Sequence, residues 1–310
     1  MKVVVALGGN ALSPSGATGS VEEMRTALDS ACDHLAGLVE AGVGLVVTHG
    51  NGPQIGRILL QQEAAAPDVP PMPMDVCGAE SQGQIGYLIA QSLDNALRRR
   101  GRRVPVLCLV TQVVVDGRDP AFRRPTKPVG PAYDAATAER IAQETGYVFT
   151  DQGRGRWRRV VASPLPVRIV EEQPLQQVVT AGHVVIASGG GGVPVVEEYD
   201  RLRGVEAVVD KDRTAACLAE LVGADVLAIC TDVPRVQVGF GTPSARGLPR
   251  ATVAEARAWL DAGEFPEGSM GPKVAAACDF VERTRRRAVI TDLAGVTEAV
   301  RGDAGTQIVR

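Results

Sequence analysis

VVVALGG, residues 3–9, is a short apolar run that ends in glycines. A long stretch with helical spacing, residues 21–40, separates it from a second apolar run at residues 43–48, and another helical pattern begins at Ile55. Short β-rich runs that alternate with helical stretches are typical of βαβ units and of a mainly parallel sheet. The start of the chain therefore predicts an α/β fold.

The same alternation returns later in the chain. Apolar runs at residues 184–187 and 226–229 flank a helical pattern that begins near Asp212. The predicted helix at residues 21–40 carries apolar residues three and four positions apart, so it should present one apolar face to the sheet. We expect this helix to be part of the scaffold and not of a site.

Composition restricts the class of protein. The chain has 310 residues, of which 45% are hydrophobic and 22% are charged, which fits a globular protein with one large α/β domain or two lobes and a cleft. The formal net charge of -3 gives no global attraction for nucleic acid or an anionic membrane.

The apolar runs are far shorter than the ~20 residues of a membrane span, and Met1-Lys2 leads directly into a strand, so we expect a cytoplasmic protein.

The cysteines and histidines do not predict a metal site. The chain has 6 cysteines without C-x-x-C spacing, most of them in apolar segments, and only 3 histidines. Buried free thiols are the favoured interpretation, and a metal bound by cysteine or histidine is not expected.

The composition and periodicity of the sequence change between residues 116 and 166. Prolines cluster there, basic residues gather around Trp157, and the regular periodicity weakens. We interpret residues 116–166 as an inserted subdomain or lid within a first lobe, residues 1–225, followed by a second lobe, residues 226–310.

Four glycine-bearing loops are candidate ligand-binding segments. They lie at residues 8–10, 50–53, 189–192 and 268–273. Glycine lets backbone N–H groups approach an anion, and a following helix adds its positive N-terminal end. One such loop alone could be a simple turn, but four of them favour phosphate binding. In an α/β sheet these loops should converge beyond the carboxyl ends of the strands.

Lysine is rare in this chain, which makes its positions informative. Only Lys2, Lys127, Lys211 and Lys273 occur, and the last three lie in Pro-Thr-Lys-Pro, Asp-Lys-Asp and Gly-Pro-Lys motifs. Phosphoryl transfer needs cations that follow the transferring charge and a carboxylate that orients them or holds magnesium. These lysines, with Asp212, indicate a phosphoryl-transfer enzyme, although Asp212 could also be the N-cap of the helix that starts there.

The motifs together resemble those of carbamate kinases, in the amino acid kinase superfamily. The matching segments run in order along the whole chain: residues 6–12, 48–54, 74–83, 125–131, 157–161, 188–194, 209–212 and 268–273.

This resemblance implies a three-layer αβα sandwich with a mainly parallel central sheet and a small protruding subdomain. It also implies a homodimer and a reversible reaction of ATP with carbamate that gives ADP and carbamoyl phosphate, with Mg²⁺ accompanying the nucleotide. The first lobe would hold carbamate or carbamoyl phosphate, and the second would hold ATP or ADP. A role in the catabolism of carbamoyl phosphate derived from arginine or purines, with formation of ATP, would follow.

The resemblance also implies roles for individual residues. Lys211 and Lys273 would stabilise the transferring phosphoryl group, Asp212 would orient them, and Lys127 would reach in from the subdomain. The residues expected to bind phosphate or acceptor are Gly8, Gly9, Asn10, Gly50, Asn51, Gly52, Gly190 and Gly191. The residues expected to contact the nucleotide are Thr231, Asp232, Val233, Phe240 and Met270, although Pro234-Arg235 departs from the polar residues usual in the family.

Two alternatives remain at this point. The chain could be a kinase of the same superfamily with another small carboxylate acceptor, since nothing in the sequence selects carbamate by size. It could also be a non-catalytic sensor of nucleotide or carbamoyl phosphate. The presence of all four candidate catalytic residues argues against a sensor, because a protein that only binds could lose them: Lys127, Lys211, Asp212 and Lys273.

Overall fold

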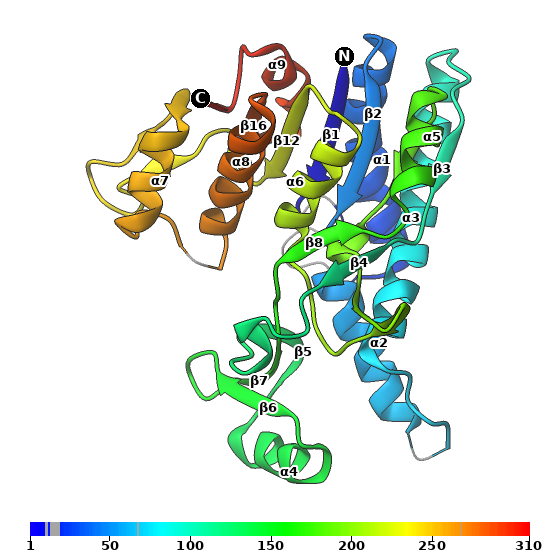
Figure 1. Ribbon diagram of the computed structural model, residues 1–310, viewed down its shortest axis with the longest axis vertical. Helices are drawn as coiled ribbons and strands as arrows, with labels where there is room; N and C mark the ends of the chain where they lie inside the picture. The colour runs from blue at the N-terminus through cyan, green and yellow to red at the C-terminus, as the bar shows by residue number, and fades with distance from the viewer. Residues whose placement is uncertain (10–11, 13–18, 67, 267) are drawn as a thin grey trace.

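The computed structural model describes residues 1–9, 12, 19–66, 68–266 and 268–310. Its centre is an eight-stranded sheet in the order β15-β17-β16-β12-β1-β2-β9-β3 (Figure 1). Six strands are parallel, and β17 and β15 run in the opposite direction. The strands are β1 (Lys2–Leu7), β2 (Gly44–His49), β3 (Val106–Cys108), β9 (Val184–Ile186), β12 (Val226–Thr231), β15 (Arg250–Thr252), β16 (Arg287–Asp292) and β17 (Thr306–Val309).

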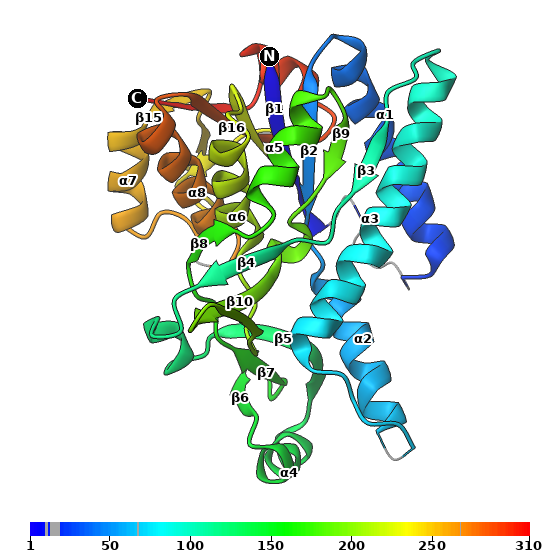
Figure 2. The same ribbon diagram turned by 45° about the vertical axis from the view of Figure 1, so that its right-hand side comes forward.

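Helices cover both faces of this sheet (Figure 2). Successive side chains of a strand point to opposite faces, so Val3 and Val5 of β1 pack in one apolar core while Val4 and Ala6 pack in the other. One face carries α1 (Val21–Glu40), α3 (Met74–Arg99) and α9 (Val296–Arg301), and the other carries α5 (Glu172–Thr180), α6 (Lys211–Leu221), α7 (Val253–Asp261) and α8 (Met270–Thr284). The predicted three-layer αβα fold is confirmed.

Helix α1 shows how the local sequence sets its own boundaries. Ser20 Oγ accepts a hydrogen bond from the backbone N–H of Glu23 at 3.2 Å, and the Glu23 carboxylate accepts one from the N–H of Ser20 at 3.1 Å. This capping box satisfies N–H groups that the first turn would otherwise leave unpaired. The apolar stripe that follows is buried against the sheet, as its spacing predicts.

A smaller sheet and a protruding subdomain are formed by residues between 112 and 204. The smaller sheet has the order β11-β10-β4-β8, and the subdomain consists of the sheet β5-β7-β6 and helix α4, which project away from the central sheet (Figure 1). Their bounds are β4 (Gln112–Val115), β5 (Lys127–Tyr133), α4 (Ala135–Thr145), β6 (Val148–Asp151), β7 (Trp157–Val161), β8 (Pro166–Ile169), β10 (Val193–Glu198) and β11 (Arg201–Gly204). The remaining elements are α2 (Gly52–Ala65), the 3-10 turns η2 (Pro120–Phe122) and η3 (Gly189–Gly191), and the hairpin of β13 (Gln237–Val238) and β14 (Arg246–Gly247).

The protruding subdomain has an apolar contact with α2. Val129 of β5 and Val161 of β7 pack with Ile55 and Ile58 in a third apolar cluster, separate from the two cores of the central sheet. This cluster fixes the subdomain beside the loop that follows β2.

Two further expectations concern the cysteines and the membrane. Four of the free thiols, those of Cys32, Cys77, Cys230 and Cys278, are buried, and burial raises the pKa of Cys32 to about 12. The other two, Cys108 and Cys217, are half-buried. Across the part of the chain that the structure describes, every helix is too short or too polar to cross a bilayer.

Candidate functional site

The glycine loops converge on one cavity. Strands β1, β2 and β9 are parallel neighbours, so the loops after them emerge at the same edge of the sheet. Together with the starts of α6 and α8 and with strand β5, they surround a cavity of about 620 Å³. The convergence predicted from the sequence is confirmed. The predicted site residues that line the cavity are Gly9, Gly50, Asn51, Gly52, Lys127, Gly190, Lys211, Asp212 and Lys273.

Helix α6 begins at this cavity, and its cap is Asp210. The Asp210 side chain accepts hydrogen bonds from the backbone N–H groups of Asp212, at 3.0 Å, and Arg213, at 3.4 Å. The expectation that Asp212 caps the helix is therefore wrong. The cap lies two residues earlier, which places Asp212 inside the first turn and leaves its carboxylate free for other partners.

Asp212 instead joins two lysines that come from different helices. Its Oδ1 accepts a hydrogen bond from Lys211 Nζ at 2.5 Å, and its Oδ2 accepts one from Lys273 Nζ at 2.9 Å. The Asp212 side chain is 3% exposed and each lysine side chain 14% exposed. One buried carboxylate thus holds two ammonium groups at the wall of the cavity.

The two lysines stabilise the ionised form of Asp212. Burial acts to raise the pKa of the carboxyl, but the charges and hydrogen bonds of Lys211 and Lys273 outweigh it and hold the pKa below its ordinary value. The carboxylate is therefore ionised at neutral pH, and both lysines have an anionic partner.

Lys127 reaches the same place from the protruding subdomain. It lies at the start of β5, and its Nζ donates a hydrogen bond to Asp210 Oδ2 at 3.1 Å. Asp210 thus caps α6 with one oxygen and binds a cation with the other. Asp210 was not among the site residues predicted from the sequence. The two carboxylates of the Asp-Lys-Asp motif were the signal that could have identified it.

The loop after β9 depends on glycine for close packing. Gly190 and Gly191 have φ values of +66° and +95°, and a Cβ atom on Gly191 would lie 2.1 Å from the carbonyl oxygen of Val209, just before α6. A Cβ atom on Gly190 would lie 2.2 Å from Asn51 Nδ2, which donates a hydrogen bond to Ser81 Oγ at 2.8 Å. Gly191 therefore backs the cavity wall, while Gly190 faces the cavity.

Replacing Gly191 with alanine is expected to lower the free energy of unfolding by about 3 kcal/mol, because left-handed strain adds to overpacking. Gly182 is a matched control, since it has a φ of +84° and nothing within 4 Å of its Cβ position. Gly182→Ala should cost only the strain, about 1–2 kcal/mol. Urea unfolding of both variants measures the difference, and equal losses would contradict the packing argument.

His49 lies behind the same loops and is not available as a base. It is 1% exposed, and its Nδ1 lies 2.9 Å from the carbonyl oxygen of Gly50, so Nδ1 carries the proton. Burial, with a contribution from the charge of Lys211, lowers the pKa of His49 to about 4. The imidazole is therefore neutral at physiological pH and serves as packing.

This lowered pKa predicts a pH dependence of stability. The unfolded chain binds a proton at His49 near its ordinary pKa of 6.5 and the folded chain only near 4, so stability should fall as the pH drops through this window. The contribution is up to about 3 kcal/mol. Urea unfolding between pH 4 and 7 should give a smaller pH slope for His49→Phe than for the wild type. Identical slopes would contradict the assignment.

Gly8 lies beside the cavity, next to two glycines that line it. A Cβ atom on Gly50 would lie 3.5 Å from Lys211 Cδ and 3.8 Å from the backbone nitrogen of Gly9, which places these three residues together. Gly8 packs behind them, where a Cβ atom would lie 3.0 Å from the carbonyl oxygen of Cys230. Asn10 lies outside the described residues.

The residues predicted to contact the nucleotide do not line this cavity. Thr231 ends strand β12, at the same edge of the sheet as the glycine loops, and Asp232 and Val233 follow it. Phe240 is 67% exposed, and Met270 begins α8 and packs against the apolar core on that face. Their contact with nucleotide remains a prediction.

Two arginines that were not predicted as site residues also line the cavity, Arg57 of α2 and Arg158 of β7. The sequence signals for Arg158 were the basic cluster around Trp157 and its place in segment 157–161, which resembles the carbamate kinases. Nothing in the local sequence distinguishes Arg57 from the arginines of the surface.

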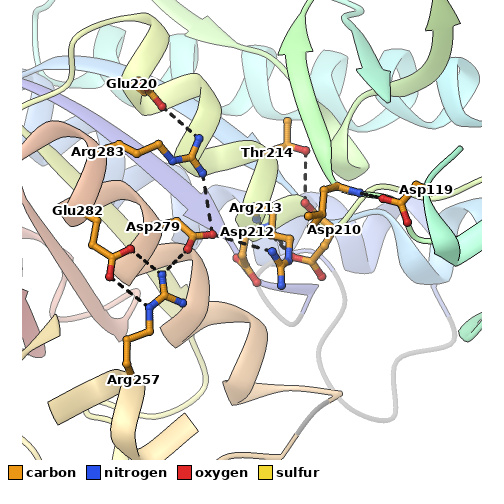
Figure 3. Close-up of polar contacts among 11 residues, drawn as sticks. Asp119, Asp210, Asp212, Arg213, Thr214, Glu220, Arg257, Asp279, Glu282 and Arg283 are labelled. Atoms are coloured by element: carbon orange, nitrogen blue, oxygen red, sulfur yellow. Dashed lines mark hydrogen bonds and ion pairs between the residues drawn. The ribbon is translucent and has the colours of Figure 1, made fainter. Parts of the chain in front are cut away.

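Ion pairs connect α6, α7 and α8 beyond the cavity (Figure 3). Asp279 of α8 lies 2.5 Å from Arg257 of α7 and 3.9 Å from Arg213 of α6, and Arg283 lies 3.3 Å from Glu220. Single exposed ion pairs contribute little, but these link the two helices that carry Lys211 and Lys273. They support the spacing of the lysines from outside the site.

The chain is similar to known proteins in both sequence and structure. Residues 1–292 match the Amino acid kinase family. A carbamate kinase of Pyrococcus furiosus is 48% identical over 99% of both chains, and one of Rhizobium meliloti is 45% identical over 99% of this chain and 93% of that protein. The solved structure of a Giardia lamblia carbamate kinase bound to AMP-PNP is 39% identical, with a TM-score of 0.94 over 99% of this chain and 98% of that one.

Proposed function

Because the chain belongs to the carbamate kinases of the amino acid kinase family, we propose that it transfers a phosphoryl group reversibly between ATP and carbamate, giving ADP and carbamoyl phosphate. The observation that carries this proposal is the pair of lysines held on one buried carboxylate, Lys211 and Lys273 on Asp212, at a cavity lined by glycine loops.

The arrangement suits the charge that develops during transfer. An oxygen of carbamate attacks the terminal phosphorus of ATP, the bond to the leaving ADP oxygen breaks, and negative charge spreads over the oxygens of the transferring group. Lys211 and Lys273 would stabilise that charge from positions that Asp212 fixes in advance, so little reorganisation is needed. Lys127 would add a third cation from the protruding subdomain.

No side chain needs to act as a general base in this reaction. Carbamate is already an anion and can attack phosphorus directly. This agrees with the neutral, buried state of His49 and with the two lysine partners of Asp212, which leave neither group suited to accept a proton.

We propose that Mg²⁺ enters with the nucleotide. The cavity presents mainly cations, and the carboxylates of Asp210 and Asp212 already bind lysines and backbone N–H groups. These residues do not form a separate set of oxygen ligands, whereas Mg²⁺ is commonly held by substrate phosphates and water. The ion would neutralise charge on the phosphates of ATP or ADP.

The wider assignments belong to the same proposal. Residues 1–225, with the subdomain at 116–166, would bind carbamate or carbamoyl phosphate, and residues 226–310, with Thr231, Asp232, Val233, Phe240 and Met270, would bind the nucleotide. We propose a cytoplasmic homodimer that forms ATP during the catabolism of carbamoyl phosphate from arginine or purines. No nucleic acid is expected as a partner.

A substrate comparison tests the proposal. Formation of ATP from ADP, Mg²⁺ and carbamoyl phosphate should be rapid, and the reverse reaction should occur with ATP, bicarbonate and ammonia. Acetylglutamate, glutamate and other small acids should not be phosphorylated at a comparable rate. Turnover with one of these acids alone would favour another acceptor, and binding of nucleotide without turnover would favour a sensor.

A further inference from the structure

Strand β5 contains a bulge where it passes the cavity. β5 pairs with β7 from Lys127 opposite Val161 to Val129 opposite Arg159, and the pairing resumes only with Ala132 opposite Arg158. Gly130, in the irregular part, has a φ of +68°, which favours glycine. A bulge of this kind bends its strand and changes the direction of nearby side chains, and bulges are frequent next to active sites.

The Arg158 side chain is hydrogen-bonded to a backbone carbonyl oxygen at this bulge. Its Nε and Nη2 atoms donate hydrogen bonds to the Gly130 oxygen at 3.1 and 2.8 Å. A guanidinium has five N–H groups, so three remain for other partners. Because Arg158 also lines the cavity, its side chain is fixed in place at the cavity wall with donors to spare.

The surroundings of Arg158 fit an anionic ligand better than a structural ion pair. Its neighbour Arg159 forms an ion pair with Glu206 and lies over the ring of Tyr147, 3.4 Å from the ring centre. Arg158 takes part in none of the ion pairs among the described residues, although it is half-buried and burial lowers its pKa. A desolvated cation without a carboxylate partner is costly unless an anion binds it.

The position of Arg158 separates it from the lysine pair. A Cβ atom on Gly56 of α2 would lie 3.6 Å from the Cα of Gly130, so the bulge rests on α2. Arg158 therefore belongs to the wall that α2 and the protruding subdomain form, whereas Lys211 and Lys273 belong to the wall that α6 and α8 form. All three residues line the same cavity, so an acceptor bound there can be approached by the lysines from one wall and by Arg158 from the other.

We infer that Arg158 binds the acceptor at the end away from the transferring phosphoryl group. In carbamate this end is the carboxylate oxygen that does not attack phosphorus, and in carbamoyl phosphate it is the carbonyl oxygen. The inference rests on the proposed function and adds a residue that determines acceptor affinity. Arginine suits this role because its guanidinium keeps its charge and has N–H donors left after it binds the Gly130 oxygen, whereas lysine is a flexible point charge.

The test compares Michaelis constants for the two substrates of ATP formation. Arg158→Ala should raise the KM for carbamoyl phosphate by about tenfold or more, the loss expected for a charge-assisted hydrogen bond, and change the KM for ADP less than about twofold. Arg158→Lys, which keeps the charge, should give an intermediate increase. Arg140→Ala removes an exposed cation of α4 in the same subdomain, outside the cavity, and should leave both constants unchanged.

Three results would overturn the inference: an unchanged KM for carbamoyl phosphate in both Arg158 variants, equal shifts for carbamoyl phosphate and ADP, or full recovery by lysine. If Arg158→Ala does not fold, Arg158→Lys alone decides through the ratio of the two constants. Failure of the proposed function would be recognised separately, because the wild-type protein would then form no ATP from carbamoyl phosphate.

Discussion

Asp212→Asn is expected to lower kcat for ATP formation by about 10²-fold or more, the scale of a lost transition-state donor. The change preserves the size of the side chain but removes the negative charge that Lys211 and Lys273 share, at 2.5 and 2.9 Å. The two ammonium groups would then repel each other and move from their fixed positions. Because the pKa of Asp212 lies below its ordinary value, the loss should be the same across neutral pH.

Asp94→Asn provides the matched control for this experiment. Asp94 is an exposed carboxylate on α3 that pairs with Arg98 at 2.6 Å, and it does not line the cavity. Its kcat should equal that of the wild type. Steady-state rates at saturating carbamoyl phosphate and ADP, with melting curves for each variant, make the comparison. A kcat for Asp212→Asn within threefold of the wild type would remove Asp212 from the mechanism.

Lys211→Met and Lys273→Met should each reduce kcat by about 10²-fold or more, because each variant loses a cation that acts on the transferring group. Methionine keeps most of the apolar stem, so the fold should persist. The double variant should be less impaired than the product of the single effects, because the two lysines act as a unit through one carboxylate. Rates of ATP formation for the three variants give this coupling directly.

Arg118→Met is the control for loss of a positive charge, since its side chain is 92% exposed on the loop after β4. It should show wild-type kinetics. Single variants that retain near-normal kcat, or a double variant with fully multiplicative losses, would contradict the shared role of the lysines.

The layered fold could be predicted because its signals are local. The alternation of apolar runs and helical stretches in residues 3–48 reflects strand and helix periodicities that the structure retains in β1, α1 and β2. The glycine loops were predictable for a related reason: loops that follow neighbouring parallel strands must emerge at one edge. The order of strands and helices along the chain was sufficient to predict that these loops converge.

The details of the site depend on geometry that the local sequence does not contain. Asp210 and Asp212 are both acidic and lie beside Lys211, and only the position at which the helix begins decides which of them is the cap. Arg158 lies opposite a two-residue irregularity in the pairing of β5 with β7, and the glycine and proline in that segment did not reveal this register. The nucleotide contacts depend on a bound molecule and remain predictions.

The central position of β1 also has a consequence for synthesis on the ribosome. Val3 pairs with Leu45 on one side but with Val226 on the other, so the first strand to be made is completed by a strand made roughly 220 residues later. At about 5–20 residues per second, that edge stays open for on the order of 10–40 seconds. The nascent chain thus carries an apolar, unpaired strand edge for most of its translation, the kind of surface that chaperones shield from aggregation.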